Sequence, residues 1–175
     1  AWQAAIRWRQ KATIGASGSV TRGTHASTMD AAYLIVAMRT AYRSLTSSLA
    51  LYSNDTPDAL GVPTALDATS LSGAPFANGL GERLSFLVAS EGDLLADRIL
   101  DGNGLAANGI DVATGARDPE PTTIESQAGA IRGLLDAYLA TSDIKYRTRA
   151  EEAYAALEST FWMAEVGAYR TTAGE

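Results

Sequence analysis

The sequence of 175 residues contains no cysteine and only one histidine, His25. Without cysteine the chain can form no disulfide, thiolate metal site, iron–sulfur cluster, c-type haem attachment or cysteine nucleophile. A single histidine also excludes a metal site built from several histidines. The surrounding "RGTHAST" does not resemble a nucleophile turn, so we interpret His25 as a surface residue or local hydrogen-bond partner, with catalysis as the alternative. We expect no metal and no cofactor.

Lysine and long apolar runs are also scarce. Lysine occurs only at Lys11 and Lys145, and the net charge of -6 opposes binding to a phosphate backbone. The densest basic stretch, "RWRQK" at 7–11, suits a nucleic acid or a membrane surface, but we favour the solvated face of an amphipathic helix. The apolar run "AAYLIVAM" is far shorter than the ~18 residues of a membrane span. We expect neither a nucleic-acid partner nor a membrane span.

Length and composition suit a single domain over residues 1–175, with 46% hydrophobic residues for its core. The chain starts at Ala1 without methionine or a signal pattern, which suggests a processed chain or a segment of a larger bacterial protein. The compartment stays open, with a lean towards an extracytoplasmic or secreted location.

Amphipathic helix patterns dominate what the sequence does contain. Ser27 and Asp30 resemble a capping box that opens a helix ending at Tyr52. Its predicted apolar face consists of Tyr33, Leu34, Ala37, Met38, Ala41, Tyr42, Leu45 and Leu49. A second helix is predicted from Leu80 to Leu100, with Gly92 as a possible weak point and with apolar residues Leu84, Leu87, Val88, Leu94, Leu95 and Ile99.

Two further helices are predicted towards the C-terminus. Thr122 and Glu125 form the pattern of a capping box, and the following helix is expected to bury Ile124, Ala128, Ile131, Leu135, Tyr138 and Leu139. The last helix begins near Ser142 or Asp143, with an apolar stripe of Tyr146, Ala150, Ala153, Tyr154, Leu157 and Phe161. A weaker pattern at Trp2–Thr13 brings the total to about five helices. The fold class is therefore all-α, with "GAYRTTA" at 167–173 as the one extended candidate.

The segments between the helices are long or rich in glycine. Residues 53–75 form an extended loop, which we expect to bind a ligand or to pack against another part of the protein. "DGNG" at Asp101–Gly104 starts like a calcium loop, but the pattern fails at Leu105, Ala106 and Val112. We therefore favour a glycine-rich helix exit.

A weak internal repeat relates "LLADRILDGNGLAANGIDVATG" to "RAEEAYAALESTFWMAEVGAYRTTAG". Each segment is an amphipathic helix followed by a turn, then glycine with a small or aromatic residue after it, then threonine and glycine. Repeats of this kind predict stacked helical hairpins, because one hairpin cannot bury both of its faces alone.

Residues 129–172, "GAIRGLLDAYLATSDIKYRTRAEEAYAALESTFWMAEVGAYRTT", resemble a hairpin of the (α/α) toroid superfamily. This superfamily includes sugar epimerases of the N-acylglucosamine 2-epimerase type, several glycoside hydrolases and toroid domains linked to thioredoxin-like domains. The resemblance implies stacked antiparallel hairpins that form part of a toroid, with inner helices around a funnel. It carries over no catalytic residue, since the active-site motifs of the sugar enzymes are not recognisable here.

A sugar hydrolase would need two carboxylates ~5 to ~9 Å apart. Our candidates are Glu125 and Asp67, drawn from the loop and helix-start acids that also include Asp101, Asp111 and Asp118. A structural role in the helix cap is the favoured alternative for Glu125. Trp162 and Tyr169 are candidates to stack on a sugar ring, although we favour core packing for these aromatics.

Two functions follow as hypotheses. The chain is either a non-catalytic helical scaffold that docks onto a protein partner or the remainder of a larger chain, or part of a carbohydrate-active toroid enzyme of glycosidase or sugar epimerase type. We slightly favour the first, because the sequence shows no legible catalytic constellation.

Overall fold

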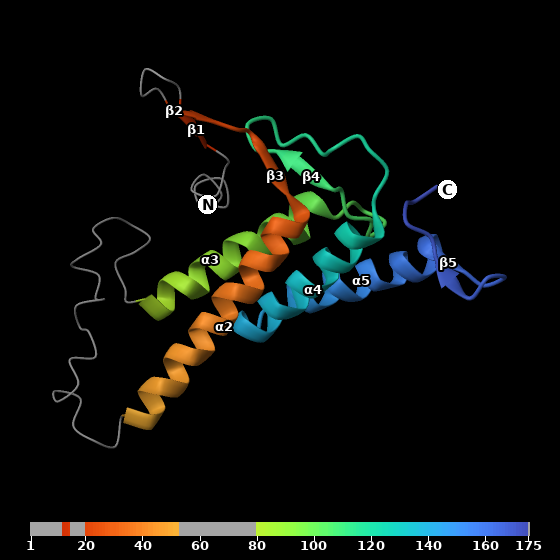
Figure 1. Ribbon diagram of the computed structural model, residues 1–175. Coiled ribbons are helices and arrows are strands. Elements are labelled where there is room, and N and C mark those ends of the chain that lie inside the picture. The colour runs from red at the N-terminus through yellow and green to blue at the C-terminus, as the bar shows by residue number, and fades with distance from the viewer. Residues whose placement is uncertain (1–11, 15–19, 53–79, 175) are drawn as a thin grey trace.

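The computed structural model describes residues 12–14, 20–52 and 80–174 and consists mainly of helices (Figure 1). Helix α2 (Thr28–Tyr52) pairs with α3 (Leu80–Leu94), and α4 (Ile124–Thr141) pairs with α5 (Ile144–Phe161). The two pairs are joined chiefly by packing between α2 and α4. The expected mainly helical fold is confirmed for this part of the chain.

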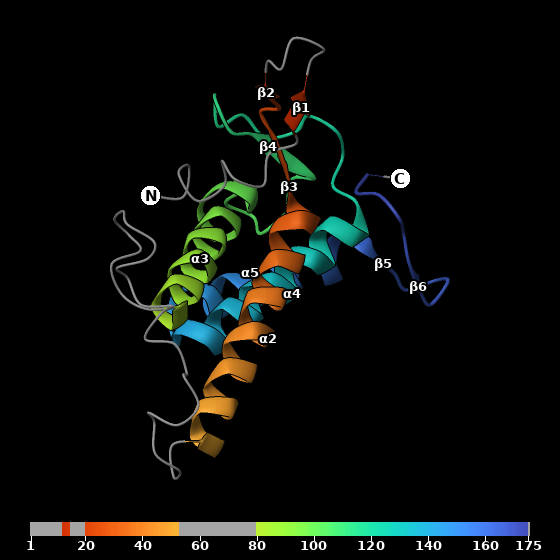
Figure 2. The same cartoon turned by 60° about the vertical axis from the view of Figure 1, so that its left-hand side comes forward.

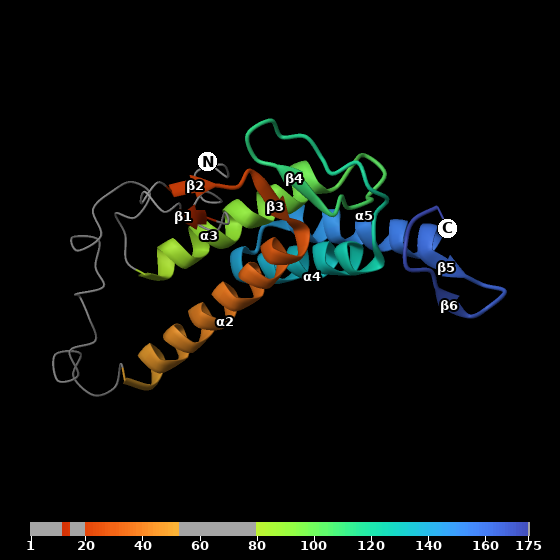
Figure 3. The same ribbon diagram turned by 45° about the horizontal axis from the view of Figure 1, so that its top comes forward.

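The helices alternate in direction. Both α2 and α4 begin near the strands β3 and β4 and run away from them, whereas α3 and α5 run back (Figures 1 and 3). Figure 2 shows α2, α3, α4 and α5 after a turn of 60° about the vertical axis. We call α2 and α4 the inner helices and α3 and α5 the outer helices. Each helix in the described residues is too short or too polar to cross a bilayer.

The described residues form three two-stranded ladders. They pair β1 (Ala12–Ile14) with β2 (Val20–Arg22), β3 (His25–Ser27) with β4 (Gly109–Asp111), and β5 (Trp162–Met163) with β6 (Ala168–Tyr169). Strand β6 lies within the extended segment predicted at 167–173. The helix predicted to end at Thr13 is wrong at its end, because Ala12–Ile14 is a strand; residues 1–11 lie outside the described part.

The helix starts were predicted well, with one shift. Ser27 Oγ accepts from Asp30 N (3.4 Å), as expected for α2. In α4 the N-cap is Thr123 and not Thr122, and Thr123 Oγ1 accepts from Ser126 N (3.2 Å). The predicted capping box with Glu125 is therefore wrong by one residue. Two adjacent threonines offer the same hydroxyl, and only the backbone path decides between them.

The second predicted helix runs through Gly92 without a break. Its irregularity lies further along, where a π-helical turn, η4 (Leu95–Ile99), ends the helix. A Cβ added at Gly92 would lie 2.9 Å from Cε1 of Tyr146. Gly92 therefore permits close packing between α3 and α5.

The buried faces agree with prediction in the outer helices and in part in the inner ones. Along α3, η4 and α5 the predicted stripes are buried or partly buried, apart from Tyr154, which is exposed. In the inner helices the predicted residues Leu34, Met38, Ile124, Ile131 and Tyr138 are buried or partly buried. The buried face also includes residues that were not predicted: Ala31, Ala32 and Ile35 in α2 and Ser126, Gln127, Gly129, Ala130, Gly133, Leu134, Asp136 and Ala137 in α4. The side chains of Tyr42, Leu45 and Leu49 lie outside the described part. Several residues predicted as core are exposed: Tyr33, Ala37 and Ala41 in α2, and Ala128, Leu135 and Leu139 in α4.

Candidate functional site

The two hairpins share one pattern of backbone hydrogen bonds. In the first hairpin, β4 pairs with β3 just before α2, and Thr28 N donates to Asn108 O (3.0 Å). In the second, Thr172 bridges to Thr123 just before α4, and Ile124 N donates to Thr171 O (2.9 Å). The N-caps Ser27 and Thr123 therefore occupy equivalent positions.

The turns after the outer helices are equivalent as well. Ala107 N donates to Ile99 O (3.0 Å), and Arg170 N donates to Phe161 O (2.9 Å). Inside these bonds, Leu100 bridges to Ala106 and Trp162 pairs with Tyr169. We call residues 99–107 the first return turn and residues 161–170 the second return turn.

In each return turn a glycine lies two residues before the second residue of the inner pair, which is Ala106 in the first turn and Tyr169 in the second. These glycines, Gly104 and Gly167, have φ values of 82° and 67°. The internal repeat in the sequence thus has a counterpart in the backbone of the two hairpins.

The second hairpin covers the first return turn through Gln127. This side chain is fully buried; its Oε1 accepts from Ala106 N (2.8 Å), and its Nε2 donates to Gly104 O (2.8 Å) and Ala153 O (2.7 Å). A Cβ added at Gly104 would lie 2.6 Å from Glu152 O. Backbone contact and amide hydrogen bonds together fix the second hairpin on the first.

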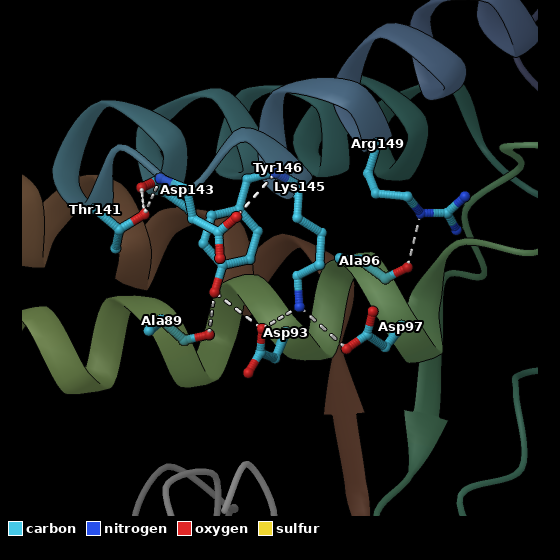
Figure 4. Close-up of polar contacts among 10 residues, drawn as sticks. Ala89, Asp93, Ala96, Asp97, Thr141, Asp143, Lys145, Tyr146 and Arg149 are labelled. Carbon is cyan, nitrogen blue, oxygen red and sulfur yellow. Dashed lines mark hydrogen bonds and ion pairs between the residues drawn. The ribbon is translucent and has the colours of Figure 1, made fainter.

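Polar contacts also join the outer helices (Figure 4). Lys145 Nζ lies 2.6 Å from Asp93 Oδ1 and 3.3 Å from Asp97 Oδ2. The Tyr146 hydroxyl lies 2.9 Å from Asp93 Oδ1 and 3.0 Å from Ala89 O. Burial, followed by the contact with Asp93, raises the pKa of Tyr146 well above its ordinary value. The hydroxyl is therefore a donor that holds α5 on α3.

Arg149 binds the π-helical turn at the end of this interface. Its Nε donates to Ala96 O (2.9 Å), and its Nη2 donates to Asp101 O (3.1 Å). Asp101 in turn accepts at Oδ1 from Asn103 N and Leu105 N (2.8 and 2.9 Å). The "DGNG" segment is a helix exit whose aspartate binds its own backbone, which is the favoured interpretation of the sequence.

The second return turn is exposed where the first is covered. Trp162 and Tyr169 are 40% and 41% exposed, whereas the equivalent Leu100 and Ala106 are 5% and 0% exposed. A Cβ at Gly167 would meet nothing within 4 Å. The hairpin that covers one turn has no equivalent over the other among the described residues.

The exposed rings contact each other edge to face. The ring centroids of Trp162 and Tyr169 are 4.9 Å apart, and their planes are inclined by 60°. The Tyr169 hydroxyl donates to Glu158 Oε1 (2.5 Å), and this bond raises the pKa of Tyr169 to about 12. The core packing favoured for these aromatics is wrong for Trp162 and Tyr169, while Phe161 is fully buried.

The inner helices show the same difference between a covered and an exposed face. A Cβ at Gly133 would lie 3.2 Å from the Ala32 Cβ, so α4 packs directly on this face of α2. Counted from the N-caps, Ala32 corresponds to Ala128, which is exposed. We call Ala128, Leu135, Leu139, Trp162 and Tyr169 the downstream surface. Within it, Ala128, Trp162 and Tyr169 correspond to Ala32, Leu100 and Ala106, which are buried in the first hairpin, and Leu135 and Leu139 are further exposed residues of α4.

A buried carboxylate also lies between the inner helices. Asp136 is buried, and its two oxygens lie 2.5 Å from Arg39 Nη1 and from Arg132 Nε. Arg39 comes from α2 and Arg132 from α4. Neither this ion-pair cluster nor Gln127 was identified from the sequence; the available signal was a polar residue inside an apolar helix segment.

The described residues do not bring the predicted catalytic carboxylates together. Glu125 is exposed in the first turn of α4, and Asp67 lies outside the described residues. Asp111 accepts from the backbone and hydroxyl of Thr114 (2.7 and 2.9 Å). Hydrogen bonds from Thr24, and then from Thr114, hold the pKa of Asp111 below its ordinary value. This acid therefore stabilises its own turn.

His25 pairs with Asp118, the remaining candidate acid. Its Nε2 lies 2.9 Å from Asp118 Oδ2, so His25 has the local partner that the sequence suggested. Across residues 12–14, 20–52 and 80–174, no three acidic, histidine or cysteine side chains form a group that could hold a metal ion.

Comparison with protein-family models and with curated proteins finds no match to this chain. The structural feature that distinguishes the two return turns is that the second exposes Trp162 and Tyr169, which belong to the downstream surface, where the first buries Leu100 and Ala106. We therefore take this surface as the candidate functional site.

Proposed function

We propose that the protein is a non-catalytic helical scaffold that docks onto protein through its downstream surface. The observation that carries the proposal is the exposed pair Trp162 and Tyr169, at positions equivalent to two buried residues of the first return turn. Exposed aromatic rings are enriched at protein interfaces. We also propose that the stack of hairpins has the curvature of part of an (α/α) toroid, as the resemblance of residues 129–172 implies.

The alternative function is a carbohydrate site, in which the rings of Trp162 and Tyr169 would stack on a sugar. A sugar ring stacks best on an open, flat aromatic face. The planes of Trp162 and Tyr169 are inclined by 60°, so the two rings form no common flat platform. This geometry favours a shaped protein contact over a sugar-binding platform.

Site-specific photo-crosslinking tests the docking function. A benzophenone amino acid replaces Trp162 in one variant and Thr148, an exposed residue of α5, in a control variant. We expect irradiation of cells that make the protein to give discrete protein adducts from position 162 and not from position 148. Equal adduct formation at the two positions, or none at either, would contradict the proposal.

A further inference from the structure

We propose that the partner on the downstream surface is a second copy of this chain, which docks head to tail with its first hairpin. This inference rests on the proposed docking function. A second copy fits this surface because both halves of the contact are present in the described part of the chain. One half is the downstream surface, and the other is an exposed apolar face of α2.

The exposed face of α2 corresponds to the face by which α4 packs on α2. In α4 this contact is made by Gly129 and Gly133, whose added Cβ atoms would lie 2.5 Å from Met29 Sδ and 3.2 Å from Ala32 Cβ. Counted from the N-caps, Gly129 and Gly133 correspond to Tyr33 and Ala37, which are both exposed. We call Tyr33, Ala37 and Ala41 the upstream surface.

Repeating the observed contact between copies gives a residue-level pairing. Within the chain, Ala32 of α2 meets Gly133 of α4. Between copies, Ala128 of one copy therefore meets Ala37 of the next. Both are small residues, but Ala37 carries the Cβ that Gly133 lacks, and a Cβ at Gly133 would lie 3.2 Å from the Ala32 Cβ. The paired helices of two copies therefore lie a few tenths of an ångström further apart than α2 and α4 do. The pairing requires a small, exposed residue on the downstream surface and another on the upstream surface.

At the second return turn, the proposed contact between copies differs from the contact that the first return turn makes inside the chain. The position of Gln127 is taken in α2 by Ala31, which is buried in its own hairpin and offers no amide. The second return turn carries large rings where the first carries Leu100 and Ala106. We infer that burial of Trp162 and Tyr169 replaces the hydrogen bonds of Gln127 at this contact.

A head-to-tail contact uses different surfaces on the two copies and leaves one surface of each kind free at the ends. Assembly therefore continues beyond a dimer as concentration rises, unless a ring closes. A symmetric dimer through a single surface would stop at two copies. This difference makes the proposal testable by mixing variants.

The experiment is sedimentation velocity on the full chain over a range of concentrations. The downstream variant carries Trp162→Glu and Tyr169→Glu, and the upstream variant carries Tyr33→Glu and Ala37→Glu. We expect the unaltered chain to form dimers and larger species, and each variant alone to associate at least about tenfold more weakly. An equal mixture of the two variants keeps one intact contact and should recover dimers but no larger species. Circular dichroism checks that each variant folds. If the downstream variant does not fold, it is replaced by Trp162→Ser with Tyr169→Ser. If the upstream variant does not fold, it is replaced by Tyr33→Ser with Ala37→Ser.

Each result decides the proposal. Recovery of dimers in the mixture, with weak association of each variant alone, supports head-to-tail assembly. A monomer at every concentration, or dimers of either variant alone that match the unaltered chain, overturns it. A crosslinked adduct at position 162 to a different protein also overturns the second copy as partner but leaves the docking function intact.

Discussion

At the scale of single residues, Gln127 joins the second hairpin to the first return turn. Its amide binds one backbone donor and one backbone acceptor of the first return turn, Ala106 N and Gly104 O, and a second acceptor, Ala153 O, in α5. A buried polar group that loses its hydrogen-bond partner lowers the free energy of unfolding by ~1–3 kcal/mol. At the surface the loss is smaller, because water takes the place of the lost partner. A single amide is therefore more important here than any of the exposed charges.

We predict that Gln127→Met lowers the free energy of unfolding by about 2–4 kcal/mol, because it leaves buried backbone groups without partners. Urea denaturation followed by circular dichroism measures the change. Glu125→Gln, an exposed substitution in the same helix, is the control and should change stability by less than about 0.5 kcal/mol. Similar small losses for both variants would show that the amide contributes little.

At the scale of elements, the two return turns have the same backbone and different surroundings. Gly104 and Gly167 both have positive φ, so alanine is strained at either position. Only Gly104 is also in close contact with the other hairpin, through Glu152 O. Comparison of the two positions separates backbone strain from packing between hairpins.

We predict that Gly167→Ala costs about 1 kcal/mol from strain alone, and that Gly104→Ala costs at least about 1–2 kcal/mol more from overlap with the second hairpin. Urea denaturation at low protein concentration measures both, so that association does not contribute. Equal costs at the two glycines would mean that the second hairpin does not hold the first return turn closed.

The sequence predicted elements better than it predicted their faces. Spacing of apolar residues identified α2, α3, α4 and α5 in the described part of the chain, because a helix of this length needs a continuous apolar stripe wherever it packs. The inner helices are apolar on two adjoining faces, so periodicity alone could not say which face is covered. The ladder β3–β4 was missed because each strand has three residues, too few for an alternating pattern to be recognised.

The candidate site could be predicted only in part. Trp162 and Tyr169 were singled out from the sequence, but as sugar-stacking or core residues. Their exposure depends on the absence of a covering hairpin among the described residues, a tertiary fact that local pattern does not contain. The role of Gln127 likewise depends on a turn more than twenty residues earlier in the chain.

At the scale of the whole molecule, the two hairpins form a short stack with one exposed apolar face at each end. Residues predicted as core and found exposed lie on these faces: Tyr33, Ala37 and Ala41 upstream, and Ala128, Leu135 and Leu139 downstream. In repeat proteins, the residues at such positions contact the next repeat. The mismatch between predicted and observed burial is thus what points to a partner at each end.

Disulfide crosslinking between copies tests this account most directly, because the chain contains no cysteine of its own. Equal amounts of an Ala37→Cys variant and an Ala128→Cys variant are mixed and mildly oxidised. The proposed contact places these Cβ atoms near the ~3.5–4.5 Å that a disulfide requires. We predict a covalent dimer that forms much faster in this mixture than in either variant alone, or in a control mixture of Ala37→Cys with Thr148→Cys. Equal rates in all four samples would contradict head-to-tail docking of the two surfaces.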